Sequence, residues 1–106
     1  MPQTPLPPFL TRFSEFNSDF VDQVATLREE AYYTPSALDV KTKLLVALAL
    51  DLFSGSESGT RLLAQRARIA GATDAEIADL ARICYSVAGL QRMATAVAAF
   101  ETSTTP

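Results

Sequence analysis

The stretch AGATDAEI, residues 70–77, decides how the C-terminal half of the chain is interpreted. Gly71 follows a segment of helical periodicity and is predicted to be the left-handed residue that ends that helix. Thr73 and Glu76 have the spacing of a capping box, in which the threonine oxygen accepts a backbone hydrogen bond and the glutamate reaches back. The stretch therefore predicts the end of one helix and the start of the next.

Outward from this turn, apolar residues recur with helical spacing in every segment. A stripe of phenylalanines opens the chain, and a helix is expected from an N-cap at Asn17 or Ser18 to about residue 31. Further helices are expected from Asp39 to about 53, from the loop at 54–59 to 70, from 74 onward, and after Gly89. Their predicted inward faces comprise Phe20, Val24, Leu27 and Ala31, then Ile77, Leu80, Cys84 and Val87, then Leu90, Met93, Val97 and Phe100.

The predicted architecture is all-α, an array of five to six helices. Residues 1–8 are interpreted as a disordered proline-rich N-terminus, 9–100 as a single domain and 101–106 as a frayed tail. The segment 44–50 is apolar all the way round, so it needs cover either within the domain or from a partner subunit. With few other helices available, we expect self-association.

Composition excludes several classes of function. The formal net charge is -3, which gives the phosphates of nucleic acids no electrostatic reason to bind. The chain has no histidine and one cysteine, Cys84, which excludes an internal disulfide, zinc sites and Ser-His or Cys-His nucleophile pairs. We expect no metal and no cofactor, and we expect Cys84 to be a buried structural residue.

The sequence predicts a cytoplasmic protein. Residues 1–8 lack the basic region and the apolar run of a signal peptide. The longest apolar run, 44–50, is much shorter than the roughly 20 residues that cross a bilayer. No membrane association is expected.

A family resemblance rests on the motif LDVKTK at 38–43, followed by an apolar helix, a Gly/Ser loop, and AGAT at 70–73 with Glu76-Ile77. In this order and spacing, residues 33–100 resemble the carboxymuconolactone decarboxylase and alkylhydroperoxidase D-like family. The resemblance implies an all-α, alkylhydroperoxidase D-like fold that assembles as a homotrimer or homohexamer. It also implies a site near residues 54–63, at or beside a subunit interface.

Peroxidase members of that family carry a C-x-x-C-x-x-x-H run after the loop and a glutamate about three turns upstream. One thiolate attacks the peroxide and the other resolves it, while a base lowers the pKa of the attacking thiol. The corresponding positions here hold Ser56, Gly59, Leu63 and Leu44. The family label would be peroxiredoxin or decarboxylase, yet these residues cannot perform thiol peroxidase chemistry.

Two features are candidates for ligand binding. Ser56, Glu57 and Ser58 lie near a helix N-terminus, whose free N–H groups can hold a small anion, although Ser56 could simply cap the helix. Arg66 falls within an apolar arc of its helix. It needs compensation from a carboxylate such as Asp51 or a partner's acid, from a cluster of carbonyls or from an anionic ligand, unless its side chain reaches water.

Three functions are consistent with these residues. The first, which we prefer, is a non-redox oligomer that binds a small molecule in the family's catalytic pocket. The second is a divergent lactone decarboxylase in which Glu57, Arg66 or a tyrosine replaces the missing histidine. The third is a structural assembly module without a ligand.

Overall fold

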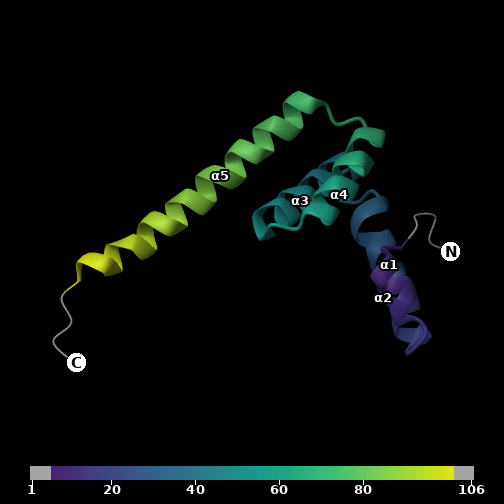
Figure 1. Ribbon diagram of the computed structural model, residues 1–106. Coiled ribbons are helices and arrows are strands. Elements are labelled where there is room, and N and C mark those ends of the chain that lie inside the picture. Colours follow the sequence, from purple (N-terminus) through teal and green to yellow (C-terminus); the bar gives the residue numbers. More distant parts are fainter. Residues whose placement is uncertain (1–5, 102–106) are drawn as a thin grey trace. The chain divides into compact units, whose positions relative to one another are not determined.

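The computed structural model describes residues 6–101, and in this range every regular element is a helix (Figure 1). The all-α prediction is confirmed. The chain divides into two compact units between Leu44 and Leu45, within one helix. The elements are α1 (Pro8–Phe13), α2 (Ser18–Arg28), the π-helical turn η1 (Glu29–Tyr33), α3 (Val40–Ser54), α4 (Glu57–Ile69), α5 (Asp74–Ala96) and the 3₁₀ turn η2 (Val97–Phe100).

Both ends of the chain were assigned at the sequence level to disordered or frayed segments. Residues 1–5 and 102–106 lie outside the described residues. Pro8, which was assigned to the N-terminal segment, is instead the first residue of α1. Its fixed φ and missing N–H suit this first helical position.

The first unit is built on α2, whose inward face lies one position away from the predicted one. Asn17 caps the helix as predicted, its Oδ1 accepting a hydrogen bond from the N–H of Phe20 at 3.1 Å. Val21 and Ala25 are the buried residues, whereas Phe20 and Leu27 are exposed. Both sets have helical spacing, so periodicity alone could not distinguish them.

A lysine from α3 fixes the end of this unit's helical segment. α2 passes into η1 after Arg28, and the chain then leaves the helix at Thr34. The Nζ of Lys43 donates to the carbonyl oxygens of Glu30 and Thr34, at 3.3 and 2.6 Å. Carbonyls at a helix end have no intrahelical partner, so this contact satisfies groups that would otherwise depend on water.

The second unit has a small core shared by α3, α4 and α5. Leu48 is 0% exposed, and Leu63, Ala67, Ala72 and Cys84 are buried. The Sγ of Cys84 donates to the carbonyl oxygen of Ala49 at 3.4 Å, which ties α5 to α3. The predicted burial of Cys84 is confirmed.

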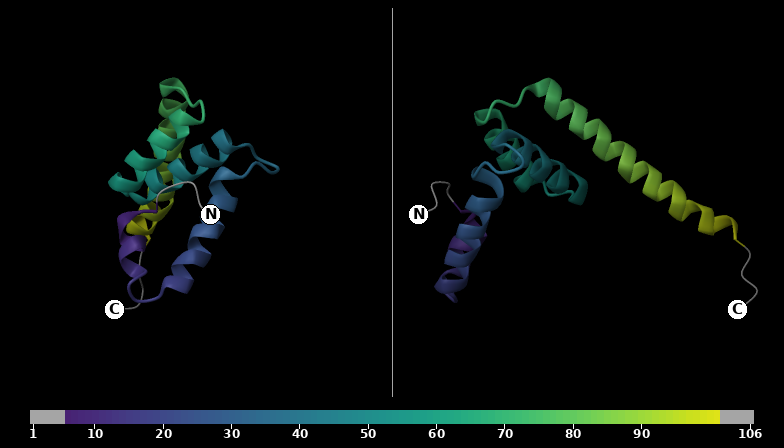
Figure 2. Two further views of the ribbon diagram at one scale, coloured as in Figure 1. Left: turned by 90° about the vertical axis from the view of Figure 1, so that its right-hand side faces the viewer. Right: turned by 180° about the vertical axis from the view of Figure 1, so that it is seen from behind.

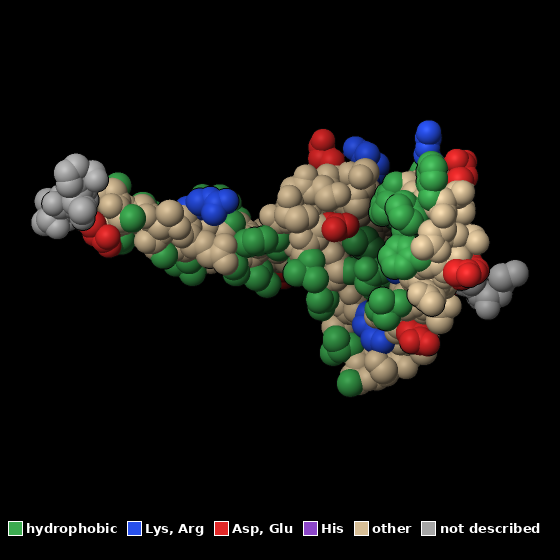
Figure 3. All heavy atoms as spheres, turned by 90° about the horizontal axis from the view of Figure 1, so that it is seen from below, with side chains coloured by type: hydrophobic (Ala, Val, Ile, Leu, Met, Phe, Trp, Pro, Cys, Tyr) green, Lys and Arg blue, Asp and Glu red, His purple; other side chains and the backbone are tan. Residues whose placement is uncertain are grey.

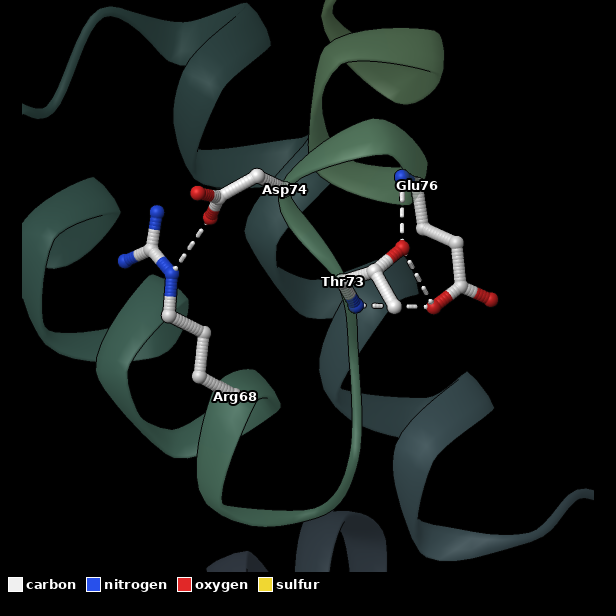
Figure 4. Close-up of polar contacts among 4 residues, drawn as sticks. All are labelled: Arg68, Thr73, Asp74 and Glu76. Carbon is white, nitrogen blue, oxygen red and sulfur yellow. Dashed lines mark hydrogen bonds and ion pairs between the residues drawn. The ribbon is translucent and has the colours of Figure 1, made fainter.

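The turn at residues 70–74 has the predicted structure (Figure 4). Gly71 has a φ of +104°, and the N–H groups of Gly71 and Ala72 donate to the carbonyls of Arg68 and Ala67, which is a Schellman ending for α4. Thr73 and Glu76 then form both hydrogen bonds of the capping box. The turn thus joins α4 to α5 through local hydrogen bonds alone.

The C-terminal region differs from the prediction in two ways. Gly89 does not separate two helices, because α5 continues through it to Ala96; an interior glycine costs only about 1 kcal/mol relative to alanine. The residues predicted to face inward after Gly89 are instead exposed. The exposed fractions are 69% for Leu90, 68% for Met93, 58% for Val97 and 87% for Phe100.

Continuity through Gly89 also creates a long apolar helix that the sequence analysis did not anticipate. The segment Asp74–Phe100 has the length and composition of a membrane span, with 6% of the apolar window buried. Figure 2 shows this segment as one uninterrupted helix, and Figure 3 shows hydrophobic side chains along it. The apolar middle of α3 is likewise only partly covered, since Val46, Leu50 and Phe53 are exposed.

Candidate functional site

The α3–α4 connection and the first turn of α4 contain Ser56 and Gly59, the residues that the resemblance aligns with the peroxidase cysteines. Ser56 is the N-cap, and its Oγ accepts a hydrogen bond from the N–H of Gly59 at 3.2 Å. Gly55 has a φ of +83°, which lets the chain turn tightly between α3 and α4. Ser56 therefore has the capping role that the sequence analysis weighed against ligand binding, and Glu57 lies in the first turn, where the helix dipole favours an acid.

Gly59, the residue that the resemblance aligns with the second peroxidase cysteine, packs against the carboxylate of Asp51. A Cβ atom placed on Gly59 would collide with an Oδ of Asp51, and would lie 2.8 Å from the Asp51 Cγ and 2.9 Å from the Ser56 Oγ. Real Cβ atoms essentially never approach heavy atoms this closely. Glycine is thus required at 59 as long as Asp51 keeps this position.

Asp51 is a residue that the sequence analysis missed at this site. It was considered only as an ion-pair partner of Arg66, and no such pair exists within residues 6–101. The α3–α4 turn brings its carboxylate to the first turn of α4, where the backbone of Ser56 also donates to the Asp51 carbonyl oxygen at 3.0 Å. A carboxylate is favoured beside a helix N-terminus, and this one takes a place that an anionic ligand would need.

A surface hollow of about 470 Å³ lies beside this turn. Two of the predicted ligand-binding residues, Ser56 and Glu57, line it, whereas Ser58 and Arg66 do not. Its other lining residues are Leu52, Gly55, Thr60, Arg61 and Ala64. The hollow is open to solvent. Its lining includes one acidic side chain, Glu57, one basic side chain, Arg61, and the apolar side chains of Leu52 and Ala64.

The two remaining relay positions are part of the packed interior. Leu44 is 1% exposed and Leu63 is 7% exposed. Neither side chain can transfer a proton, and their burial leaves no room there for a polar group that could. In the isolated chain the relay positions therefore contain a cap, a glycine packed against a carboxylate, and two core leucines.

Arg66 has the half-buried environment that its place in the apolar arc predicted. Its Nε is buried and has no hydrogen-bond partner, whereas Arg61 and Arg68 are exposed. Arg68 pairs with Asp74 at 3.0 Å (Figure 4). Arg66 thus has a buried Nε without a hydrogen-bond acceptor, and its side chain does not line the hollow.

The tyrosines give no support to a tyrosine-based site at this turn. Tyr85 is 82% exposed on α5. Tyr32 and Tyr33 lie in the first unit, where their rings pack edge to face and Arg28 lies over the ring of Tyr32 at 5.5 Å. Within residues 6–101, no group of three His, Cys, Asp or Glu side chains is arranged to hold a metal ion.

Comparison with known families decides the assignment. The model of the carboxymuconolactone decarboxylase family matches residues 18–102, which is most of the chain. The chain belongs to the carboxymuconolactone decarboxylase family. No curated protein and no solved structure gives a match.

The matched residues include all four positions that the resemblance aligns with the peroxidase relay. The match covers α2 through η2, so it includes Leu44, Ser56, Gly59 and Leu63. This member of the carboxymuconolactone decarboxylase family has one cysteine and no histidine.

Proposed function

We propose that this carboxymuconolactone decarboxylase family protein has no thiol peroxidase activity and binds a small molecule as a homo-oligomer. The observation that carries the proposal is the contact between Asp51 and Gly59, because it fills the space that a second cysteine would need. The hollow lined by Ser56, Glu57 and Arg61 lies at the same turn and is the binding site that we propose.

The chemistry of this hollow favours a small ligand with both polar and apolar parts. Glu57 and Arg61 can each form a charge-assisted hydrogen bond, while Leu52 and Ala64 offer apolar contact. Asp51 opposes a bare anion at the helix N-terminus, so we favour a zwitterionic or neutral polar ligand over the small anion first expected. A partner subunit could enclose the open side of the hollow.

Native mass spectrometry after incubation with a metabolite extract tests binding. The proposal predicts a homo-oligomer carrying a stoichiometric small-molecule adduct. Glu57→Gln and Arg61→Ala should lower adduct occupancy at least several-fold. Ser58→Ala is the matched control, because Ser58 neighbours Glu57 but does not line the hollow. Adduct occupancy that none of these variants changes would contradict the site.

A hydroperoxide-consumption assay with a dithiol reductant tests the loss of peroxidase activity. We predict a rate equal to that of the protein-free mixture, because Cys84 is the one thiol of the sequence and it is buried away from the peroxide. Turnover that Cys84→Ala abolishes would contradict the proposal.

A structural assembly module is the second candidate. The burial of Leu44 and Leu63 favours it, because these residues fill the relay positions with core rather than with a cavity. An oligomer that carries no adduct from any extract would support this candidate over the first. A decarboxylase using Glu57 with Arg66 is not advanced, since Arg66 does not line the hollow.

A further inference from the structure

The C-terminal half of α5 has an apolar stripe that is left exposed by the residues that the structure describes, 6–101. Its members are Ile83, Val87, Leu90, Ala94 and Val97, at alternating steps of four and three residues. This is the a/d spacing of a coiled coil over two heptads. All five are exposed, Ile83 at 63% and Leu90 at 69%.

A second stripe on the same helix packs inside the second unit. Cys84 is buried and Ile77, Leu80, Ala81 and Ala88 are half-buried. The exposed stripe is therefore not the helix's own core face. It is a separate surface with helix-pairing geometry.

We propose that the exposed stripe pairs antiparallel with the same stripe of a second copy of this chain. This inference rests on the homo-oligomer in the proposed function and names the surface that forms it. In the antiparallel register, Val87 packs against the partner's Leu90, and Ile83 against the partner's Ala94.

The amount of apolar surface fits a contact between copies. With Met93 and Phe100, the stripe offers six large apolar side chains that are 41–87% exposed, a patch to compare with the roughly 800 Å² that each partner contributes to a standard interface. Exposed apolar patches of this size mark interaction sites on soluble proteins.

The charge pattern favours a second copy over a membrane. Arg92 is the one charged side chain of residues 83–100, and helical geometry places it on the side of α5 opposite the stripe. Pairing two stripes buries no charge. Insertion of Asp74–Phe100 across a bilayer would instead place Arg92 in the hydrocarbon, which strongly disfavours a charged side chain.

The antiparallel direction follows from the helix itself. Opposed helices align their dipoles favourably. The contact of α5 with α3 lies at Cys84, N-terminal to most of the exposed stripe, so an antiparallel pair places the α3 helices of the two copies apart. Such a contact has two-fold symmetry, which predicts an even number of subunits and selects the hexamer over the trimer.

Disulfide trapping tests both the surface and its direction, in a Cys84→Ser background. An equimolar mixture of Ile83→Cys and Ala94→Cys proteins, mildly oxidised, should give a cross-linked heterodimer. Each variant alone should not cross-link, because identical positions lie about 11 residues apart along the antiparallel pair, roughly 16 Å at 1.5 Å per residue. Cross-linking of each variant with itself would overturn the antiparallel register.

Native mass spectrometry of Leu90→Asp gives an independent readout. The substitution should halve the subunit number. Tyr85→Asp, at a site that is 82% exposed on the opposite side of α5, should leave it unchanged. An oligomer that Leu90→Asp leaves intact, or a wild-type oligomer with an odd subunit number, overturns this inference while the homo-oligomer stands. A wild-type monomer that floats with phosphatidylcholine/phosphatidylglycerol vesicles overturns both and identifies a membrane helix.

Discussion

The first turn of α4 and the C-terminal half of α5 differ in how far the chain covers their side chains. At α4, small residues are closed in by local contacts: Ser56 caps the helix, and Asp51 fills the space over Gly59. At α5, large apolar residues such as Leu90 and Phe100 have no cover. The contrast teaches that contacts within one chain close the first turn of α4, whereas they leave the apolar side chains of α5 exposed.

The largest effect should come from the buried core that supports both regions. Leu48→Ala should destabilise the protein by about 2–5 kcal/mol, because Leu48 is 0% exposed and its truncation leaves a cavity in the core. Chemical denaturation followed by circular dichroism measures this. Leu50→Ala is the matched control two residues away, 66% exposed in the single chain.

The control sharpens the comparison. In a disassembled Leu90→Asp background, Leu50→Ala should cost less than about 0.5 kcal/mol, as surface substitutions do. A cost close to that of Leu48→Ala would show that the uncovered face of α3 is buried within a single subunit, contrary to our description.

Gly59→Ala should lower the free energy of unfolding by about 1–3 kcal/mol, the usual cost of overpacking. The added Cβ meets the carboxylate of Asp51, so the same substitution in an Asp51→Ala background should cost much less. A double-mutant cycle by urea denaturation isolates this coupling. Equal costs in the two backgrounds would show that Asp51 does not hold this position.

Ser56→Ala should cost about 0.5–2 kcal/mol through loss of the N-cap. Ser58→Ala, inside the first turn, is the control and should leave thermal stability nearly unchanged or slightly raised, because alanine is the better helix former. If Ser56→Ala also leaves thermal stability unchanged, the first turn of α4 does not depend on its N-cap.

The smallest effect concerns pH. Hydrogen bonds from the Thr42 side chain and backbone lower the pKa of Asp39, which caps α3. This contribution to stability is present above the unfolded pKa of about 3.9 and is lost as the pH falls through the lower folded value. Asp39→Asn should retain the cap and flatten this acid dependence, as measured by unfolding between pH 2 and 6.

The sequence predicted the local features well. Capping by Asn17 and Thr73 and the left-handed Gly71 follow from side chains and backbone within a few residues, and the structure has all three. Burial of Cys84 followed from its place among apolar neighbours. Local interactions of this kind are encoded in short stretches, so a single sequence is enough to find them.

Longer-range features were not predictable in the same way. Gly89 reads as a helix boundary, yet helix hydrogen bonds tolerate it, and the stripe beyond it was assumed to face inward because apolar residues usually do. Asp51 and Gly59 are separated by eight residues across a turn, and no sequence pattern places the carboxylate over that glycine. The one hint in the sequence is a glycine in the first turn of a helix, where it lowers helix propensity without an evident local reason.

Hydrogen–deuterium exchange of the intact protein, read by mass spectrometry, tests the contrast most directly. Paired α5 helices should protect the amides of residues 83–97 at micromolar concentration, and Leu90→Asp should remove that protection while residues 60–67 of α4 keep theirs. Fast exchange of residues 83–97 in the wild-type protein would contradict the account, because it would show that α5 remains uncovered in solution.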